Sequence, residues 1–343
     1  MKSSSTNNNN KKFHLIINGD KRSSYLFVIA TIPVLVGITG AFWDLTYHTL
    51  NKVDTFFQPA HLVIYNSIFA ALLIGIVIAL KTRYLSLAII SGIQLATGFT
   101  DLMWHNAFGF DSFLSPPHTA LVITAVLQPW LLFRKLCELD SEIGKVVSLG
   151  TLWLSITFLL LEFSLASNRT EITSFYIIPP QIVSLIVSAL MMPILSVLIA
   201  VTSRSIGIKH IYVSCIYFAA IAISTLISNY YVTFTMPFLI VGTIIPAIIY
   251  DKYERLGSIL FAAAWIITYA PYSFRIIIYA INGQIFGTSH TFTLSYSLAG
   301  YYPTLVLMGI ASGSIFYYLY TRYNLPKILL TMTNQITPRN KQR

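Results

Sequence analysis

The sequence predicts an all-α, polytopic membrane protein with about ten transmembrane helices. Its 343 residues are 55% hydrophobic and only 10% charged, with a mean hydropathy of +0.70. Soluble globular chains carry about 25% charged residues, so this composition favours a protein embedded in the lipid bilayer. The apolar runs are long and do not alternate with polar residues, which excludes transmembrane strands.

The expected helices follow one another with short loops between them. A membrane-spanning helix needs about 20 mostly apolar residues, and boundaries set from sequence are good to about 2–4 residues. The ten expected spans cover residues 26–50, 60–80, 84–107, 117–134, 146–167, 176–201, 210–229, 235–250, 257–281 and 294–320.

Lysine and arginine set the orientation of these spans. Basic residues precede the first span, recur in every second loop and fill the C-terminal tail, whereas the alternate loops hold only Lys52 and Arg169. By the positive-inside rule, both termini are expected to be cytoplasmic. The chain then forms five helical hairpins whose tips lie on the non-cytoplasmic side of the cell membrane.

Proline is expected to open the second helix of each hairpin, because the first turn of a helix tolerates its missing N–H. The prolines at or near these positions are Pro59, Pro116, Pro117, Pro179, Pro180, Pro237 and Pro303.

Four regions are expected along the chain. Residues 1–25 are polar and rich in Asn and Ser, which predicts a disordered cytoplasmic tail. Residues 26–135 form a four-helix region that contains a repeated motif. Residues 136–320 supply six further helices, and residues 321–343 form a basic cytoplasmic tail.

The net charge of +10 does not indicate a nucleic-acid-binding protein. The basic residues are spread over short loops instead of gathering on one phosphate-binding face. Cys137 and Cys215 are the only cysteines, so neither a disulfide framework nor a thiolate metal site is indicated.

Two stretches of the four-helix region are copies of one pattern. The segment Trp43–His61 reads WDLTYHTLNKVDTFFQPAH, and the segment Thr100–His118 reads TDLMWHNAFGFDSFLSPPH. Each contains D-x3-H, then a loop, then P-x-H. Aligned without a gap, they share the pairs Asp44/Asp101, His48/His105, Asp54/Asp111, Phe56/Phe113, Pro59/Pro116 and His61/His118.

The repeated residues predict two metal sites. An Asp and a His four residues apart face the same side of a helix, and a short loop returns the second His beside them. Each hairpin therefore offers two imidazoles and one carboxylate, a donor set that suits copper, zinc or iron(II) and leaves a position for water or substrate. The six expected ligands are Asp44, His48, His61, Asp101, His105 and His118.

A structural role is the alternative for each of these side chains. A single intramembrane His or Asp commonly forms a helix–helix hydrogen bond. Asp54 and Asp111 are read as helix caps or turn residues in preference to partners of the ligand histidines. Glu162 and Arg275 are expected to pair across the bundle, with a substrate or proton path as the alternative. His14, His210 and His290 belong to no recognisable pattern.

The pattern D-x3-H-x12-H within membrane helices resembles the C subunit of the copper membrane monooxygenases, the particulate methane and ammonia monooxygenases. In that family an Asp and two His with this spacing bind copper inside the membrane, and Asp44, His48 and His61 match them. Asp101, His105 and His118 would correspond to the family's second copper site, with Asp in place of its Asn and a slightly shorter gap. The resemblance covers about residues 40–120.

The resemblance implies a copper-dependent oxidation of a small substrate, performed as one subunit of a membrane complex. Two other functions remain open from the residues alone. The two sites could be successive stations in a transition-metal transporter or carrier. They could also hold a metal-bound water in an intramembrane hydrolase. The sequence leaves open whether the two triads form one dinuclear site or two mononuclear sites.

Overall fold

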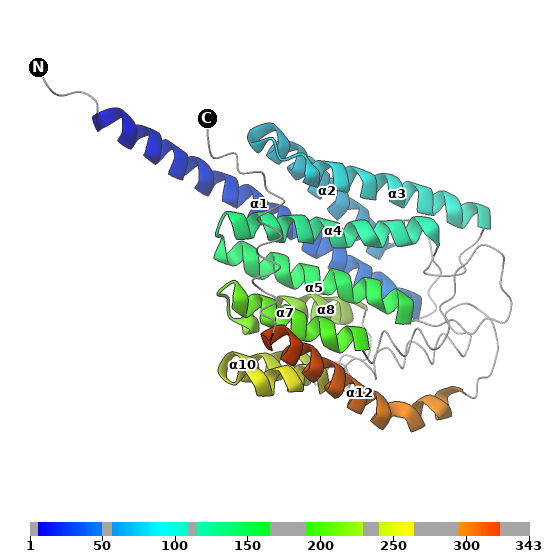
Figure 1. Ribbon diagram of the computed structural model, residues 1–343. Coiled ribbons are helices and arrows are strands. Elements are labelled where there is room, and N and C mark those ends of the chain that lie inside the picture. Colours follow the sequence, from blue (N-terminus) through cyan, green and yellow to red (C-terminus); the bar gives the residue numbers. More distant parts are fainter. Residues whose placement is uncertain are drawn as a thin grey trace, which may run out of the picture.

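The structure is a computed structural model that describes residues 6–49, 57–108, 115–164, 190–228, 240–263 and 294–322. Its regular elements within these ranges are all helical, which confirms the all-α prediction. Figure 1 shows the helices stacked side by side, with most axes running along one common direction.

The first five helices follow each other as antiparallel neighbours. They are α1 (Thr6–Thr49), α2 (Pro59–Thr82), α3 (Ser86–Phe108), α4 (Pro116–Glu138) and α5 (Glu142–Ser164). Each packs against the next, and α1 also contacts α4 and α5. Proline opens α2 and α4 as predicted, at Pro59 and Pro116.

Further helices complete the bundle on the other side of α5. They are α7 (Met192–Ser205), α8 (His210–Ser228), the π-helical η2 (Ile240–Ile244), α10 (Ile245–Lys252) and α12 (Leu294–Arg322). The helix α8 packs against α1, α5 and α10, and α7 packs against α5 and α12. Because α12 begins at Leu294, Pro303 lies inside this helix and does not open it. Pro179, Pro180 and Pro237 lie outside the described residues.

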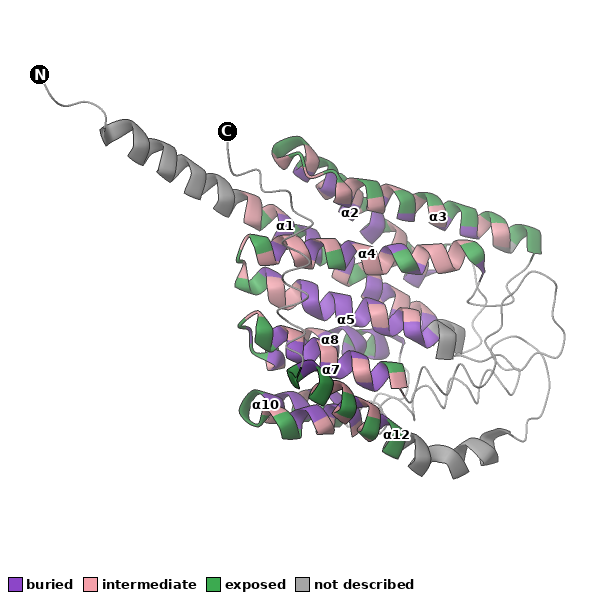
Figure 2. Cartoon of the chain, viewed as in Figure 1, coloured by how far each residue is buried: buried purple, intermediate pink, exposed green. Residues whose placement is uncertain are grey.

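Burial shows which helices are central and which are peripheral (Figure 2). In the span of α5, 72% of residues are buried, against 28% in the spans of α2 and α3. The core around α5 includes Trp153 and Tyr217, whose rings lie 4.2 Å apart. On the peripheral helices large apolar side chains such as Leu80 and Met103 are 81% and 70% exposed. Such apolar outer surfaces fit contact with lipid.

Six of the described helices are long and apolar enough to cross a membrane. The spans lie at Ser23–Leu45, Pro59–Thr82, Ser86–Phe108, Pro116–Glu138, Glu142–Leu161 and His210–Ser228. These helices indicate a multi-pass membrane protein. The expected spans at 176–201, 235–250 and 257–281 lie partly outside the described residues.

Helix α1 begins earlier than the expected first span. Residues 1–25 were expected to form a disordered tail, whereas α1 is helical from Thr6 onward. The apolar part of α1, at Ser23–Leu45, is a packed helical segment from which the helix extends toward the N-terminus. Extension of an existing helix avoids the unfavourable nucleation step, so a polar sequence can continue it.

The two ends of the bundle differ in composition. The turns between α2 and α3, α4 and α5, and α7 and α8 lie together at the left of Figure 1. This end carries the basic side chains Lys81, Arg83, Arg134, Lys145, Arg204 and Lys209. We call it the basic end. The opposite end, at the right of Figure 1, holds the end of α1, the start of α2, the end of α3 and the start of α4.

Candidate metal centre

The first hairpin brings Asp44 and His61 together. Asp44 lies near the end of α1, and His61 lies in the first turn of α2. Their side chains approach to 3.3 Å between Nε2 of His61 and Oδ1 of Asp44. Both are largely buried, with 19% and 15% of the respective side chains exposed. A carboxylate removed from water in this way needs strong partners.

Gln58 supplies one such partner. Its Nε2 donates to Oδ1 of Asp44 at 2.5 Å, and Gln58 itself is only 3% exposed. The residue directly precedes α2, where its extended backbone and the following Pro59 start the helix. The same turn therefore fixes both Gln58 and His61 opposite Asp44.

Glycine allows α1 and α2 to approach closely just below this site. A Cβ at Gly40 would lie 3.0 Å from Cγ1 of Val63 and 3.2 Å from Cγ1 of Ile64. Both distances are shorter than an ordinary carbon–carbon contact of about 3.5–4.0 Å. Gly40 is four residues before Asp44 and thus one helical turn away from it. The close helix packing brings the carboxylate of α1 within reach of α2.

The second hairpin repeats this arrangement with Asp101 and His118. Nδ1 of His118 lies 3.5 Å from Oδ2 of Asp101, and 16% and 8% of these side chains are exposed. Ser115 precedes α4 and caps it, because its Oγ accepts from the backbone N–H of His118 at 3.2 Å. The hydroxyl also donates to Oδ1 of Asp101 at 3.2 Å.

Gln58 and Ser115 occupy the same position in the aligned copies. Each lies 14 residues after its aspartate and donates to that aspartate's Oδ1. Sequence reasoning did not assign this role, because the two residue types differ and only Ser115 resembles a helix cap. The signal was a polar hydrogen-bond donor directly before the proline in both copies. Asp54 and Asp111, which the sequence analysis reads as helix caps or turn residues, lie outside the described residues.

The third expected ligand of each site is placed by its backbone alone. The backbones of His48 and His105 lie in α1 and α3, one turn after Asp44 and Asp101. Their side chains are not among those described. Among the described side chains, no group of three or more His, Cys, Asp or Glu could hold a metal ion. Arg275 and the side chain of Glu162 also lie outside the described part of the chain.

Tyr65 of α2 lies near His61 and packs against α3, the helix that carries Asp101. It lies one turn after His61 on α2, and the two rings are 6.1 Å apart in an edge-on arrangement. A Cβ at Gly98 of α3 would lie only 2.5 Å from Cε1 of Tyr65. Gly98 is three residues before Asp101, so the Tyr65 ring fills the space between the first site and the helix that carries the second.

Another histidine, His210, lies at the basic end among aromatic rings and two polar residues. His210 is fully buried, and its ring lies 5.7 Å from Trp153 and 4.8 Å from Phe261. The Oγ of Ser203 donates to the carbonyl of Ala200 at 2.7 Å and therefore accepts from Nδ1 of His210 at 3.1 Å. Sequence reasoning assigned no role to this histidine.

Asp251 fixes His210 through the backbone. Its carboxylate accepts from the backbone N–H groups of His210 at 2.9 Å and Ile211 at 3.0 Å. The first N–H groups of a helix lack partners within the helix, so Asp251 of α10 caps the start of α8. These contacts identify the cluster as a packing element of the basic end.

No family model, no curated protein and no solved structure matches the chain.

Proposed function

We propose that this protein binds two transition-metal ions within the membrane, one at each Asp-His-His set. The observation that carries the proposal is the spacing of Asp and His in both hairpins, 3.3 Å and 3.5 Å. Two ligand atoms bound to one tetrahedral metal at about 2.0–2.1 Å lie about 3.4 Å from each other. A direct hydrogen bond is the alternative, and the contact between His118 and Asp101 also meets the distance limit of one, so metal content decides between the two.

The supporting contacts are those that a metal site needs. Carboxylate ligands in proteins are oriented by hydrogen bonds from neighbouring side chains. Gln58 and Ser115 provide such bonds at matching positions. The helix termini that hold Asp44, His61, Asp101 and His118 also belong to packed hairpins, which keeps the donor atoms in place before a metal arrives. His48 and His105 are proposed as the third ligands because their backbones lie one turn from the aspartates.

The proposed metal is copper, and the proposed reaction is the oxidation of a small substrate. Two imidazoles with one carboxylate suit copper, and they also suit iron(II) or zinc. Copper is preferred because D-x3-H-x12-H resembles the C subunit of the copper membrane monooxygenases. Bound copper would supply redox chemistry with oxygen. Because that chemistry needs a reductant, the proposal includes other membrane subunits as partners.

The chain's own residues would prepare the site for that chemistry. Gln58 and Ser115 hold the aspartates in a fixed orientation. The small exposure of all four described ligands, 8–19%, limits access of water. The ring of Tyr65 lies 6.1 Å from the ring of His61 and against Gly98 of the helix that carries Asp101.

The proposed topology has ten spans in five hairpins, with both termini in the cytoplasm of a cell and the metal sites toward the outer face of the cell membrane. The basic end supports it, because positively charged loops remain on the cytoplasmic side. The candidate metal sites occupy the opposite end of the same bundle (Figure 1).

Metal content tests the proposal. The protein is purified from membranes in mild detergent, and copper, iron, zinc and manganese per chain are counted by mass spectrometry. We expect two copper ions per chain, one after His61→Ala or His118→Ala, and none after both substitutions. His14→Ala also removes one histidine, but outside the repeated motif. This variant is the matched control and should retain two copper ions.

Other outcomes separate the remaining functions. Zinc at the same stoichiometry would contradict the oxidation reaction and favour a carrier or an intramembrane hydrolase. Metal transport across liposomes would then identify the carrier, and oxygen-independent hydrolysis the hydrolase. A metal-free protein, with His61→Ala and His118→Ala variants as stable as the wild type, would show that the repeated residues serve helix packing.

A further inference from the structure

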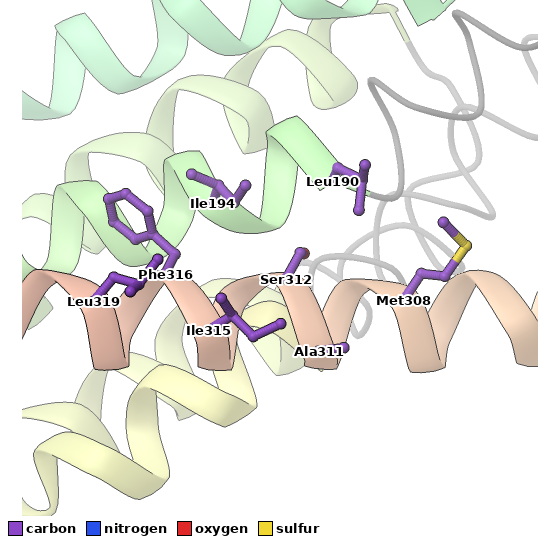
Figure 3. A pocket seen from close by; sticks show the side chains of 8 residues that line it. All are labelled: Leu190, Ile194, Met308, Ala311, Ser312, Ile315, Phe316 and Leu319. Carbon is purple, nitrogen blue, oxygen red and sulfur yellow. The ribbon is translucent and has the colours of Figure 1, made fainter.

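An apolar groove lies on the outer surface of the bundle between α7 and α12, far along the chain from the candidate metal sites. Its volume is about 390 Å³. Figure 3 shows the side chains that line it, most of them on α12. They are Leu190, Ile194, Met308, Ala311, Ser312, Ile315, Phe316 and Leu319.

The lining predicts an apolar occupant. Ser312 is its one hydroxyl-bearing side chain, and that hydroxyl donates to the carbonyl of Gly309 at 3.0 Å. The groove opens outward, because Met308, Ile315 and Leu319 are 40%, 58% and 40% exposed. In a membrane-spanning bundle, outward-facing apolar side chains contact acyl chains of the lipid.

The length of the groove fits one acyl chain of one leaflet. Along α12 it extends from Met308 to Leu319, which at about 1.5 Å per residue is about 16 Å. This is roughly half of the about 30 Å hydrocarbon core of a bilayer. The end at Leu319 lies toward the basic end of the bundle, because α12 finishes there at Arg322.

A cationic side chain stands just beyond that end. Arg322 follows Leu319 by three residues and is exposed. Its Nη1 donates to the hydroxyl of Tyr318 at 2.5 Å, and no described carboxylate lies within ion-pair distance of it. Arg204 at the end of α7 differs, because Glu254 neutralises it at 3.1 Å. A guanidinium that has no carboxylate partner among the described residues is suited to bind a phosphate.

We propose that this groove is a binding site for one anionic phospholipid. One acyl chain lies in the groove between α7 and α12, and the phosphate contacts the guanidinium of Arg322. Anionic lipids are enriched in cytoplasmic leaflets, and each Lys or Arg near the surface attracts them with about 1 kcal/mol. The proposal is independent of metal binding, but its choice of the cytoplasmic leaflet rests on the proposed topology.

Lipid retention tests the site. The full-length protein is stripped of loosely bound lipid in detergent and titrated with phosphatidylglycerol or with phosphatidylcholine of the same acyl chains, and bound lipid is counted by native mass spectrometry. We expect one retained phosphatidylglycerol. Ala311→Trp, which fills the groove from an exposed position, should abolish retention of both lipids. Arg322→Gln should reduce the preference for phosphatidylglycerol about fivefold, which corresponds to the loss of about 1 kcal/mol.

Matched controls lie on other helices of the same bundle. Ile89→Trp adds the same ring to an exposed position of α3, and Lys81→Gln removes a basic residue from the end of α2. Both should retain the lipid with unchanged preference. Equal loss in Ile89→Trp and Ala311→Trp would mean unspecific surface lipid and would overturn the proposal. Unchanged retention in Ala311→Trp, as expected if another segment of the chain fills the groove, would also overturn it.

Discussion

At the scale of single residues, the candidate site is a pair of aspartates and the side chains that hold them. Asp44 and Asp101 are each contacted by a histidine from the first turn of the following helix and by a hydrogen-bond donor from the residue directly before that helix. The donors differ in type, Gln58 in one hairpin and Ser115 in the other. Each site can therefore be altered without touching its expected ligands.

The first prediction concerns Gln58 and Ser115. Loss of a side chain that orients a metal ligand typically lowers metal affinity about 10–100-fold. We expect Gln58→Ala to weaken one of the two metal equivalents by this amount and Ser115→Ala to weaken the other. Competitive titration of the purified protein with a chelator measures both. Each variant serves as control for the other hairpin. Unchanged affinity of both ions in both variants would argue that these donors serve helix packing only.

The second prediction concerns the buried contact between Ser203 and His210. Ser203→Ala removes the acceptor of the histidine's Nδ1–H in a fully buried place. A buried donor left without its partner costs about 1–3 kcal/mol, so the free energy of unfolding should fall by that amount. Ser205→Ala, two residues further on and exposed, should stay within about 0.5 kcal/mol. Denaturation in mixed micelles measures both, and equal stability of the two variants would contradict the contact.

The residues also show how far sequence reasoning reaches. Asp44, His61, Asp101 and His118 were predicted from a repeated spacing, and the structure brings each Asp to its His. Gln58 was missed because its function depends on a contact across a hairpin, not on residue type. Whether His48 and His105 complete the sites remains a prediction. The metal and the reaction also remain predictions, because the same Asp and His donors suit several metals and helix packing does not distinguish between them.

At the scale of helices, close packing depends on a few glycines. The N-terminal half of α3 approaches α2 at Gly75, where a Cβ would lie 2.9 Å from the backbone nitrogen and 3.0 Å from Cα of Ala88. Backbone atoms cannot move aside as the end of a flexible side chain can. The turn between these helices is short and begins at Arg83, whose φ of 61° is left-handed. Both features fix α3 against α2.

The third prediction compares two glycines at this contact. Gly75→Ala should lower the free energy of unfolding by about 1–3 kcal/mol, because the added methyl group pushes the helices apart. Gly92→Ala is the control on α3, since its Cβ would lie 3.9 Å from Cδ1 of Leu72, an ordinary contact. This change should be neutral or stabilising by up to about 1 kcal/mol, as expected for Ala over Gly within a helix. Thermal unfolding in detergent ranks the two, and the opposite order would contradict the packing.

Helix existence was more predictable than helix boundaries. Long apolar runs and Pro59 and Pro116 predicted α2 and α4 well. The start of α1 at Thr6 was not predicted, and Pro303 does not open a helix, although the expected span 294–320 already contained it. Composition identifies apolar segments, but a helix can continue through polar residues once it has formed. A membrane helix also tolerates proline when neighbouring groups satisfy its backbone.

At the scale of the whole molecule, the two ends of the bundle differ in composition. Basic turns gather at one end, and the candidate metal sites lie at the other (Figure 1). The outer surface between them is apolar on α2 and α3 and contains the groove of α7 and α12. The orientation of the bundle therefore matters for the proposed function. It decides from which side of the membrane metal and substrate would reach the candidate metal sites.

The fourth prediction tests this orientation. Single cysteines are placed in a background with Cys137 and Cys215 replaced, at Ser141 and Gly207 in basic turns and at Phe57 beside the candidate site. We expect a membrane-impermeant maleimide to label Ser141→Cys and Gly207→Cys only in inverted vesicles, because basic loops stay on the cytoplasmic side. Phe57, 75% exposed next to Gln58, should be labelled as cysteine only in right-side-out vesicles.

Cysteines near both chain ends extend the test to the complete topology. With ten spans, Ser4→Cys and Gln342→Cys should be labelled from the same side as Ser141→Cys. An odd number of spans would place the two ends on opposite sides, and five hairpins would then be wrong. Labelling of Phe57→Cys from the basic side would place the candidate metal sites in the cytoplasm. In that case metal would reach the sites from the cytoplasm, and an oxidation of substrate arriving from outside the cell would be contradicted.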